Sequence, residues 1–200
     1  MSTDSPNRSI MHRVFRDVGI EGDGFYLAQF ELDLVTERYL SWLRDETVNE
    51  FLVGAHSGIS FEEAARYCEK LTQSSEDLFL AIFSKTSQKY IGNVRLGPFD
   101  SVTGWCRYSM MIGPIDCRGR GLGTNVVAAS IAFCFDSLKC RKFLLEVPEA
   151  HRAARRVYEK NGLEVGRRLH PAVRADGTKL QLIEMYLDQG RYRDLRCRGM

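Results

Sequence analysis

Apolar and polar residues alternate along this chain in segments that predict both strands and helices. Apolar residues spaced by two predict strands, and apolar residues spaced by three or four predict helices. Residues 60–63 read SFEE, the pattern of a capping box, so a helix is expected to begin there. The predicted strands cover residues 24–32, 78–83, 90–96, 105–112, 142–147, 163–169 and 180–187, and the predicted helices cover residues 34–51, 60–72, 122–138 and 150–161.

This order of elements predicts one α+β domain. Three consecutive strands joined by short loops favour an antiparallel meander, and the last two strands are expected to pair across residues 175–177. The expected architecture is a mixed, mostly antiparallel, twisted sheet of about seven strands flanked by about four helices. The domain is expected to span residues 21–190, between a poorly anchored segment (residues 1–20) and a basic tail (residues 191–200).

Three glycines, at residues 119, 121 and 123, crowd the junction of the predicted strand 105–112 and the predicted helix 122–138. Residues 116–124 read DCRGRGLGT. Glycines at a strand-to-helix junction let backbone amides approach a ligand, and the helix dipole favours phosphate oxygens there. The segment is not a P-loop, because no Lys-Ser or Lys-Thr follows the glycines, and it does not open an early βαβ unit as a dinucleotide fingerprint does. The alternative is an ordinary turn at the start of a helix.

A second motif follows the predicted strand 142–147. Residues 151–163 read HRAARRVYEKNGL, and Gly162 is placed to end the helix in a left-handed cap. R-x-x-G-x-G at residues 118–123, together with this second segment, resembles the pyrophosphate loop and following helix of the GNAT acetyltransferases. The resemblance covers roughly residues 24–188. Two positions depart from the usual pattern: His151 stands for asparagine and Leu163 for phenylalanine.

The resemblance implies the GNAT fold and acetyl transfer from acetyl-CoA (coenzyme A as co-substrate) to an amine, with no metal. It implies that Tyr158 is the general acid toward the coenzyme sulfur, the alternative being an aromatic residue packed against the sheet. Glu146 is the best candidate for the base, directly or through a water, the alternative being a solvent-facing residue paired with an arginine. Many relatives carry an acid on the preceding strand, but residues 106–109 read CRYS, so the route of deprotonation stays open.

The resemblance also implies a set of coenzyme contacts. Backbone amides at a bulged end of strand 105–112, around Met111 and Ile112, are expected to polarise the thioester carbonyl. His151 is expected either to bond the pantetheine arm or simply to start its helix. The remaining expected coenzyme-binding residues are Arg118, Gly119, Arg120, Gly121, Leu122, Gly123, Thr124, Ala154 and Arg155.

The acceptor side resembles the RimJ/RimL-like branch of that family. The resemblance rests on residues 38–52 and 91–98 and implies an acceptor such as an amino sugar or sugar nucleotide. A protein N-terminus is a second candidate, and a non-catalytic acyl-CoA-binding module is a third. Tyr39, Trp42 and Phe51 are expected either to line the acceptor pocket or to pack in the core.

Composition narrows the class of protein further. The net charge is only +2, and residues 191–200 carry +3 through four arginines and one aspartate, which leaves the rest of the chain at about −1, so nucleic-acid binding is not expected. The six cysteines (Cys68, Cys106, Cys117, Cys134, Cys140 and Cys197) form no C-x-x-C pair, which indicates reduced, structural thiols. No apolar run approaches 18 residues and the N-terminus is polar, so a cytoplasmic protein without a membrane partner is expected. A small-molecule amine is the expected partner, and a homodimer is allowed.

Overall fold

A mixed eight-stranded sheet forms the centre of the computed structural model, which describes residues 10–52, 58–174 and 176–199. Its strand order is β1-β2-β3-β4-β5-β6-β10-β7, and β8 and β9 form a separate two-stranded pair. In the described pairings only β5 and β6 run parallel. The strands are β1 (Ile20–Gly22), β2 (Phe25–Gln29), β3 (Leu78–Ser84), β4 (Tyr90–Asp100), β5 (Trp105–Ile112), β6 (Lys142–Pro148), β7 (Glu164–Arg168), β8 (Ala172–Val173), β9 (Lys179–Leu180) and β10 (Leu182–Asp188).

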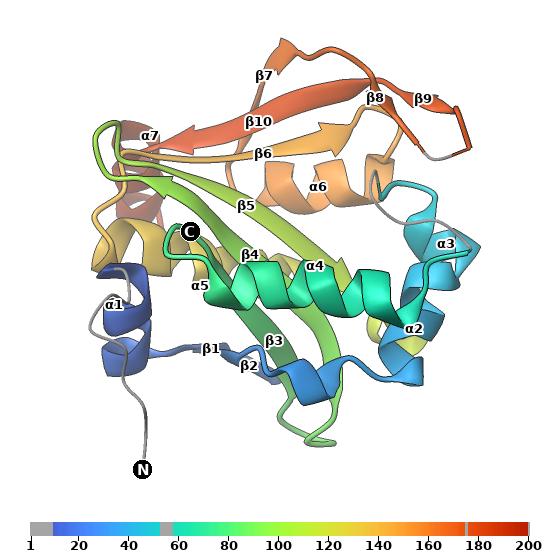
Figure 1. Cartoon of the computed structure of the whole chain (residues 1–200). Helices are drawn as coiled ribbons and strands as arrows, with labels where there is room; N and C mark the ends of the chain where they lie inside the picture. The colour runs from blue at the N-terminus through green and yellow to red at the C-terminus, as the bar shows by residue number, and fades with distance from the viewer. Residues whose placement is uncertain (1–9, 53–57, 175, 200) are drawn as a thin grey trace.

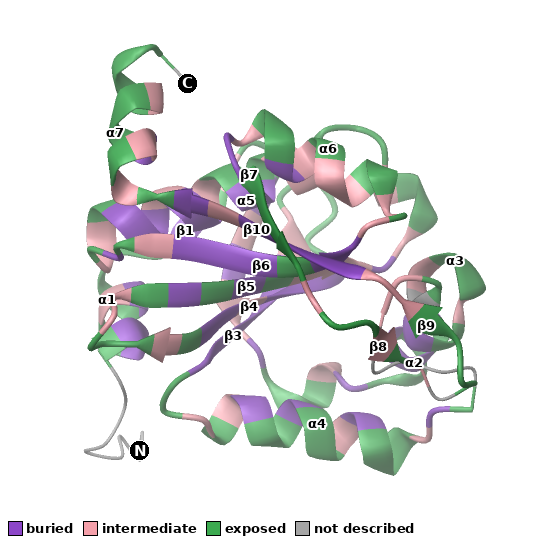
Figure 2. Cartoon of the chain, turned by 90° about the horizontal axis from the view of Figure 1, so that it is seen from above, coloured by how far each residue is buried: buried purple, intermediate pink, exposed green. Residues whose placement is uncertain are grey.

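Helices cover both faces of this sheet (Figure 1). One core lies between the sheet and α1, α5, α6 and α7, and a second core lies between the sheet and α2 and α4. Figure 2 shows α4 and α6 on opposite sides of the strands. The helices are α1 (Ile10–Val18), α2 (Glu37–Arg44), α3 (Glu46–Asn49), α4 (Phe61–Gln73), α5 (Leu122–Ala132), α6 (Arg152–Lys160) and α7 (Gln189–Cys197), with 3-10 turns η1 (Leu32–Leu34) and η2 (Ile115–Cys117) and the π-helical turn η3 (Phe133–Ser137).

Local signals in the sequence explain several boundaries. Ser60 accepts a hydrogen bond from the Glu63 amide while Glu63 bonds the Ser60 amide, so the predicted capping box begins α4. Gly162 follows α6 with a φ of 81°, and the Leu163 amide donates to the Tyr158 carbonyl across it. The expected meander is present as β3, β4 and β5.

The described part of the N-terminal segment is held against the core. Residues 10–18 form α1, in which Met11 is fully buried and Phe15 stacks edge-on against Phe133 at 6.1 Å between ring centroids. A nine-residue helix gains most of its stability from packing of its apolar face, which a pattern taken without its partners does not reveal. The short strand β1 then adds an eighth strand to the sheet.

The expected helix over residues 122–138 has two parts. The first part is the α-helix α5, which ends at Ala132, and the second is the π-helical turn η3 over the next five residues. The wider π-helical hydrogen bond is present there, since the Leu138 amide donates to the Phe133 carbonyl at 3.0 Å. The C-terminal tail likewise contains a helix, since Asp188 caps α7 by accepting from the Arg191 amide at 2.8 Å.

Candidate functional site: a glycine-rich turn beside two diverging strands

The strands β5 and β6 pair only at their first residues. Their parallel register joins Trp105 to Lys142 and Arg107 to Leu144, and no described pair follows, although both strands continue. Figure 1 shows the two strands moving apart toward their carboxyl ends. Beyond Arg107, the edge of β5 that faces β6 therefore offers backbone groups that the sheet does not use.

The glycine-rich turn lies directly after this diverging end of β5. Gly119 and Gly121 have φ values of 74° and 84°, a conformation that residues with a side chain rarely adopt. A Cβ atom at either position would meet nothing within 4 Å, so the outer surface of the turn is open. Gly121 also caps α5 without a side chain, which leaves the first amides of α5 without a side-chain acceptor. This arrangement suits an anion.

The third glycine has a packing role. A Cβ at Gly123 would lie 3.4 Å from Met110 Cε and 3.5 Å from Ile112 Cδ1, so α5 packs closely on β5. Arg118 directs its guanidinium inward, donating from Nε to the Ile112 carbonyl at 3.1 Å, from Nη2 to the Gly113 carbonyl and from Nη1 to Thr47 Oγ1 at 3.1 Å. Arg118 thus connects the turn to the end of β5 and to α3. Its contact with Thr47 of α3 was not indicated by any signal in the sequence.

Tyr158 lies on α6 in the core beneath the diverging strands. Its side chain is 7% exposed. Burial raises the pKa of Tyr158 to about 12, because the phenolate would lose its solvation. The hydroxyl therefore carries its proton at neutral pH, as a proton donor must.

Glu146 occupies the other face of the sheet. Phe143, Leu145 and Val147 point into the core that holds Tyr158, and Glu146 alternates with them toward solvent. Its Oε1 accepts from Arg107 Nη1 at 2.6 Å. Glu146 thus has the contacts of the alternative that the sequence left open, a solvent-facing residue paired with an arginine. The two catalytic candidates, Glu146 and Tyr158, lie on opposite faces of the sheet.

His151 and Phe51 form an unexpected pair. Their rings stack with centroids 4.1 Å apart and 8° between planes, which joins the start of α6 to the segment after α3. Burial lowers the pKa of His151, and nearby Glu50 opposes that effect. Phe51 therefore lies beside a predicted coenzyme residue and not in the aromatic cluster of Tyr39 and Trp42.

Tyr39 and Trp42 are core residues in this structure. They are 2% and 6% exposed and pack with Phe30 and Tyr90. A Cβ at Gly113 would overlap the Trp42 ring, so Trp42 supports the backbone just after β5. The burial of both rings supports the core-packing interpretation over direct contact with an acceptor.

The expected bulge at Met111 and Ile112 is absent from the described ladder. β5 pairs regularly with β4 from Tyr108 to Ile112, and the shift in register lies at the other end, between Leu96 and Phe99. Pro98, which has no amide hydrogen to give the ladder, stands within that shift. The divergence of β6, and not a bulge, therefore leaves the β6-facing edge of β5 unpaired near Met111 and Ile112.

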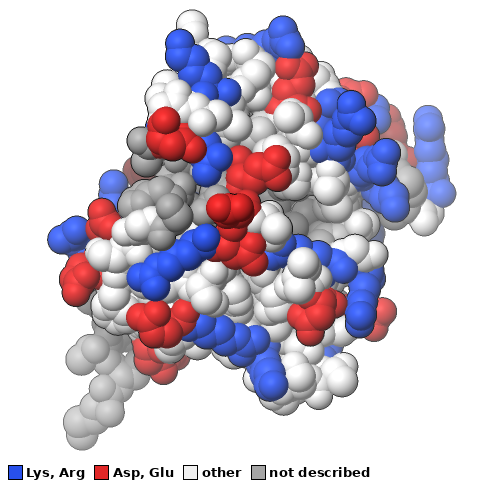
Figure 3. Space-filling view, turned by 90° about the vertical axis from the view of Figure 1, so that its right-hand side faces the viewer, with Lys and Arg blue, Asp and Glu red and all other residues white. Residues whose placement is uncertain are grey.

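The remaining expected coenzyme residues lie in the turn, at the start of α5 or on α6. Asn161 Nδ2 donates to the Thr124 carbonyl at 3.2 Å and so joins the end of α6 to the start of α5. Leu122 and Ala154 pack against the core, Arg120 is exposed, and Arg155 Nη1 donates to the Glu149 carbonyl at 3.3 Å. On the face in Figure 3, basic and acidic side chains are mixed, with several basic ones at the upper right. The helix α6 carries four basic residues, Arg152, Arg155, Arg156 and Lys160.

Comparison with protein families gives one match, the acetyltransferase (GNAT) domain, over residues 25–164. No curated protein sequence matches the chain. The matched range contains the turn, both diverging strands and α6.

Solved structures share the fold at low sequence identity. Spermidine N-acetyltransferase from Vibrio cholerae, solved with CoA and spermine, is 16% identical with a TM-score of 0.74 over 86% of this chain and 99% of its own. A GCN5-related N-acetyltransferase from Brucella melitensis is 19% identical with a TM-score of 0.75, over 90% and 82% of the two chains. A Vibrio cholerae protein assigned as a ribosomal-protein-serine acetyltransferase is 18% identical with a TM-score of 0.69, over 86% and 98%.

Proposed function

Because the chain belongs to the GNAT acetyltransferase family, whose domain matches residues 25–164, we propose that it transfers an acetyl group from acetyl-CoA to the primary amine of a small molecule, such as an amino sugar or a sugar nucleotide. The chain has the GNAT fold, as the sequence predicted, and is an acyltransferase. None of the helices in the described ranges combines the length and apolar character needed to cross a bilayer.

The observation that carries this proposal is the open turn at the start of α5. Gly119 and Gly121 present a backbone surface that any Cβ would cover, at a helix N-terminus that has no side-chain cap. These features fit the diphosphate of coenzyme A. The basic residues of α6 fit the further negative charge of that molecule. Acetyl-CoA would supply a thioester, an acyl group already activated for transfer.

Three tasks then fall to this chain's own residues. The acceptor amine must lose a proton before it attacks, since a free alkylamine has a pKa near 10. We assign that task to Glu146, directly or through a water. A backbone amide near Met111 and Ile112, on the edge of β5 that β6 leaves, would donate to the carbonyl oxygen, and Tyr158 would protonate the departing sulfur.

The positions of the two side chains support this division. Glu146 lies on the solvent face of β6 and Tyr158 in the core on its other face, so a base and an acid approach the diverging strands from opposite sides. The Arg107 ion pair holds Glu146 in place at the start of that divergence. The base acts on the attacking nitrogen and the acid on the departing sulfur, so the two groups serve different atoms of the reaction.

Free-thiol release with a panel of amines tests the proposal. The panel comprises an amino sugar, a nucleotide-linked amino sugar, a polyamine and a peptide with a free N-terminus. We expect release well above acetyl-CoA hydrolysis with a small amine and little with the peptide. Preference for the peptide would instead indicate an N-terminal acetyltransferase.

Binding without turnover is the third outcome. Calorimetry with CoA decides it, because a non-catalytic acyl-CoA module binds the coenzyme while no amine in the panel raises thiol release. That result would overturn the catalytic proposal and leave the phosphate turn intact.

A further inference from the structure

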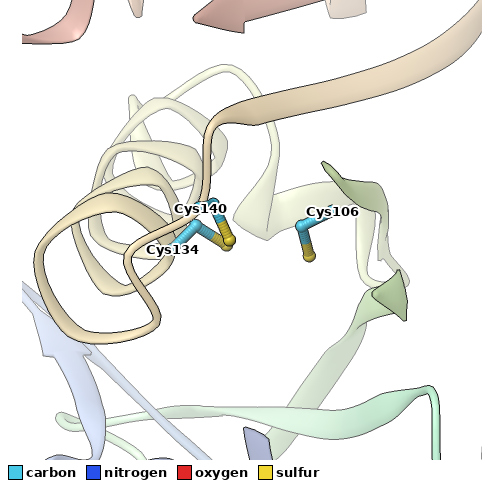
Figure 4. A group of neighbouring side chains, drawn as sticks. All are labelled: Cys106, Cys134 and Cys140. Carbon is cyan, nitrogen blue, oxygen red and sulfur yellow. The ribbon is translucent and has the colours of Figure 1, made fainter. Parts of the chain in front are cut away.

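Three cysteines from different elements meet at the paired end of β5 and β6. Cys106 is the second residue of β5, Cys134 lies in η3 and Cys140 precedes β6. Their Sγ atoms all lie within 4.8 Å of one another, and all three side chains are fully buried. Figure 4 shows Cys134 and Cys140 together on one side of this space and Cys106 on the strand across from them.

An irregular backbone brings two of these cysteines together. The π-helical turn η3 adds a residue to the helix, and the Cys140 amide then donates to the Cys134 carbonyl at 2.9 Å. Lys139 between them has a φ of 57°, which is unfavourable for a residue with a side chain. π-helical turns inside helices are frequent at functional sites.

We propose that Cys106, Cys134 and Cys140 form a binding site for one monovalent copper ion, Cu(I), held by three sulfur atoms. Soft thiolate ligands select Cu(I), zinc and iron–sulfur clusters. A metal–sulfur bond of about 2.3 Å in a trigonal arrangement separates the sulfurs by about 4 Å, so the site needs adjustments of less than about 1 Å.

The number of ligands distinguishes Cu(I) from the other soft centres. Structural zinc and iron–sulfur clusters take four protein ligands. Within the ranges that the structure describes, no fourth cysteine, histidine or carboxylate joins the group. Three sulfurs complete the coordination of Cu(I).

Charge supports the same ion. A buried site disfavours net charge. One Cu(I) bound by one thiolate and two neutral sulfur ligands has no net charge, whereas a divalent ion would require a second buried thiolate for neutrality. Any further thiol that binds as thiolate releases its proton to solvent.

The site is remote from the phosphate turn. Six residues of extended strand separate Cys106 from Ile112, or about 20 Å. Bound copper would join β5, η3 and the start of β6, so it would stabilise the fold and leave coenzyme binding unchanged.

Anaerobic titration of the reduced full-length chain with Cu(I), against a chromophoric Cu(I) chelator, tests the site. We expect one ion per chain, a thiolate-to-copper absorption band, and a rise in the thermal midpoint of about 5–10 °C at free Cu(I) about 100-fold above its dissociation constant. A double variant, Cys117→Ser with Cys197→Ser, removes the two cysteines that are not buried and should still bind one ion.

Variants of the site decide the outcome. Cys106→Ala and Cys134→Ala should each lose the absorption band and the thermal shift while still binding CoA, which shows that they are folded. Cys68→Ala removes a buried thiol elsewhere and should keep both signals. A shift that persists in Cys106→Ala, a shift produced by zinc but not by Cu(I), or binding that disappears with Cys117 and Cys197 would each overturn the proposal.

Discussion

The two ends of β5 have opposite characters. At its first residues β5 pairs with β6, and Cys106 and Phe143 are fully buried register partners. At its last residues the pairing with β6 is gone and an open glycine turn follows. The closed end satisfies its backbone within the sheet, whereas the open end leaves the edge that faces β6 unpaired, beside the turn where we propose that the coenzyme binds. Substitutions at the two ends should therefore have separable effects on stability and on binding.

The largest expected effect belongs to the closed end. Phe143→Ala removes a fully buried ring that lies 5.0 Å from the Tyr108 ring, and should lower the free energy of unfolding by about 3–5 kcal/mol. Urea denaturation measures this loss. Calorimetry on the folded variant should give a CoA affinity close to that of the wild type.

The control at this end is Val165→Ala on the edge strand β7. Val165 is 49% exposed, so its truncation should cost less than about 0.5 kcal/mol. If Phe143→Ala abolished CoA affinity in the folded protein, the two ends would not be separable.

The second effect belongs to the open end and concerns rate. Tyr158→Phe should lower kcat about 100-fold and leave the affinity for CoA within about twofold, because a general acid acts in the transition state. The raised pKa of Tyr158, about 12, adds a pH criterion. Loss of the phenolic proton should not lower the wild-type rate until the pH approaches that value.

Tyr192→Phe is the matched control for Tyr158→Phe. Tyr192 has a pKa raised to about 12 by burial, but it lies on α7 and donates to Asp136. Its loss should leave kcat unchanged. A similar fall in both variants would mean that the rate depends on core packing and not on the acid.

The third effect concerns coenzyme affinity. Gly121→Val forces a branched side chain into a left-handed conformation and covers the turn, and should weaken CoA binding about tenfold or more. Gly24→Val is its control, since Gly24 has a φ of 79° and equal space but lies in the β1–β2 turn. Both variants should lose similar stability in a thermal melt, and only Gly121→Val should lose affinity by calorimetry.

Features encoded by neighbouring residues were predicted from the sequence. The capping box at Ser60, the cap at Gly162 and the meander each depend on a few consecutive positions, and the structure contains all three. The GNAT fold followed from two local motifs. Their loop and helix lie where the sequence placed them.

Features that depend on tertiary contacts were not predicted. Cys106, Cys134 and Cys140 have no recognisable spacing, because their proximity comes from a π-helical turn and a parallel strand pair. Tyr39 and Trp42 show the same limit, since an aromatic residue on an amphipathic helix suits a pocket and a core equally. Burial, which the sequence does not encode locally, separates these interpretations.

The smallest effect concerns the link between α6 and the segment after α3 at the open end. Burial lowers the pKa of His151 below its usual 6.5, so the unfolded chain binds more protons between the lowered value and 6.5. The contribution of His151 to the free energy of unfolding should therefore fall as the pH drops below 6.5 and be constant above 6.5. His151→Asn should remove this contribution, which we expect to be less than about 1 kcal/mol because the imidazole is partly exposed. Phe51→Ala uncovers the imidazole and should reduce the dependence of stability on pH in the same direction.

Denaturation at several pH values measures the effect. An unchanged pH dependence in His151→Asn would show that the stacked pair of His151 and Phe51 does not make stability depend on pH.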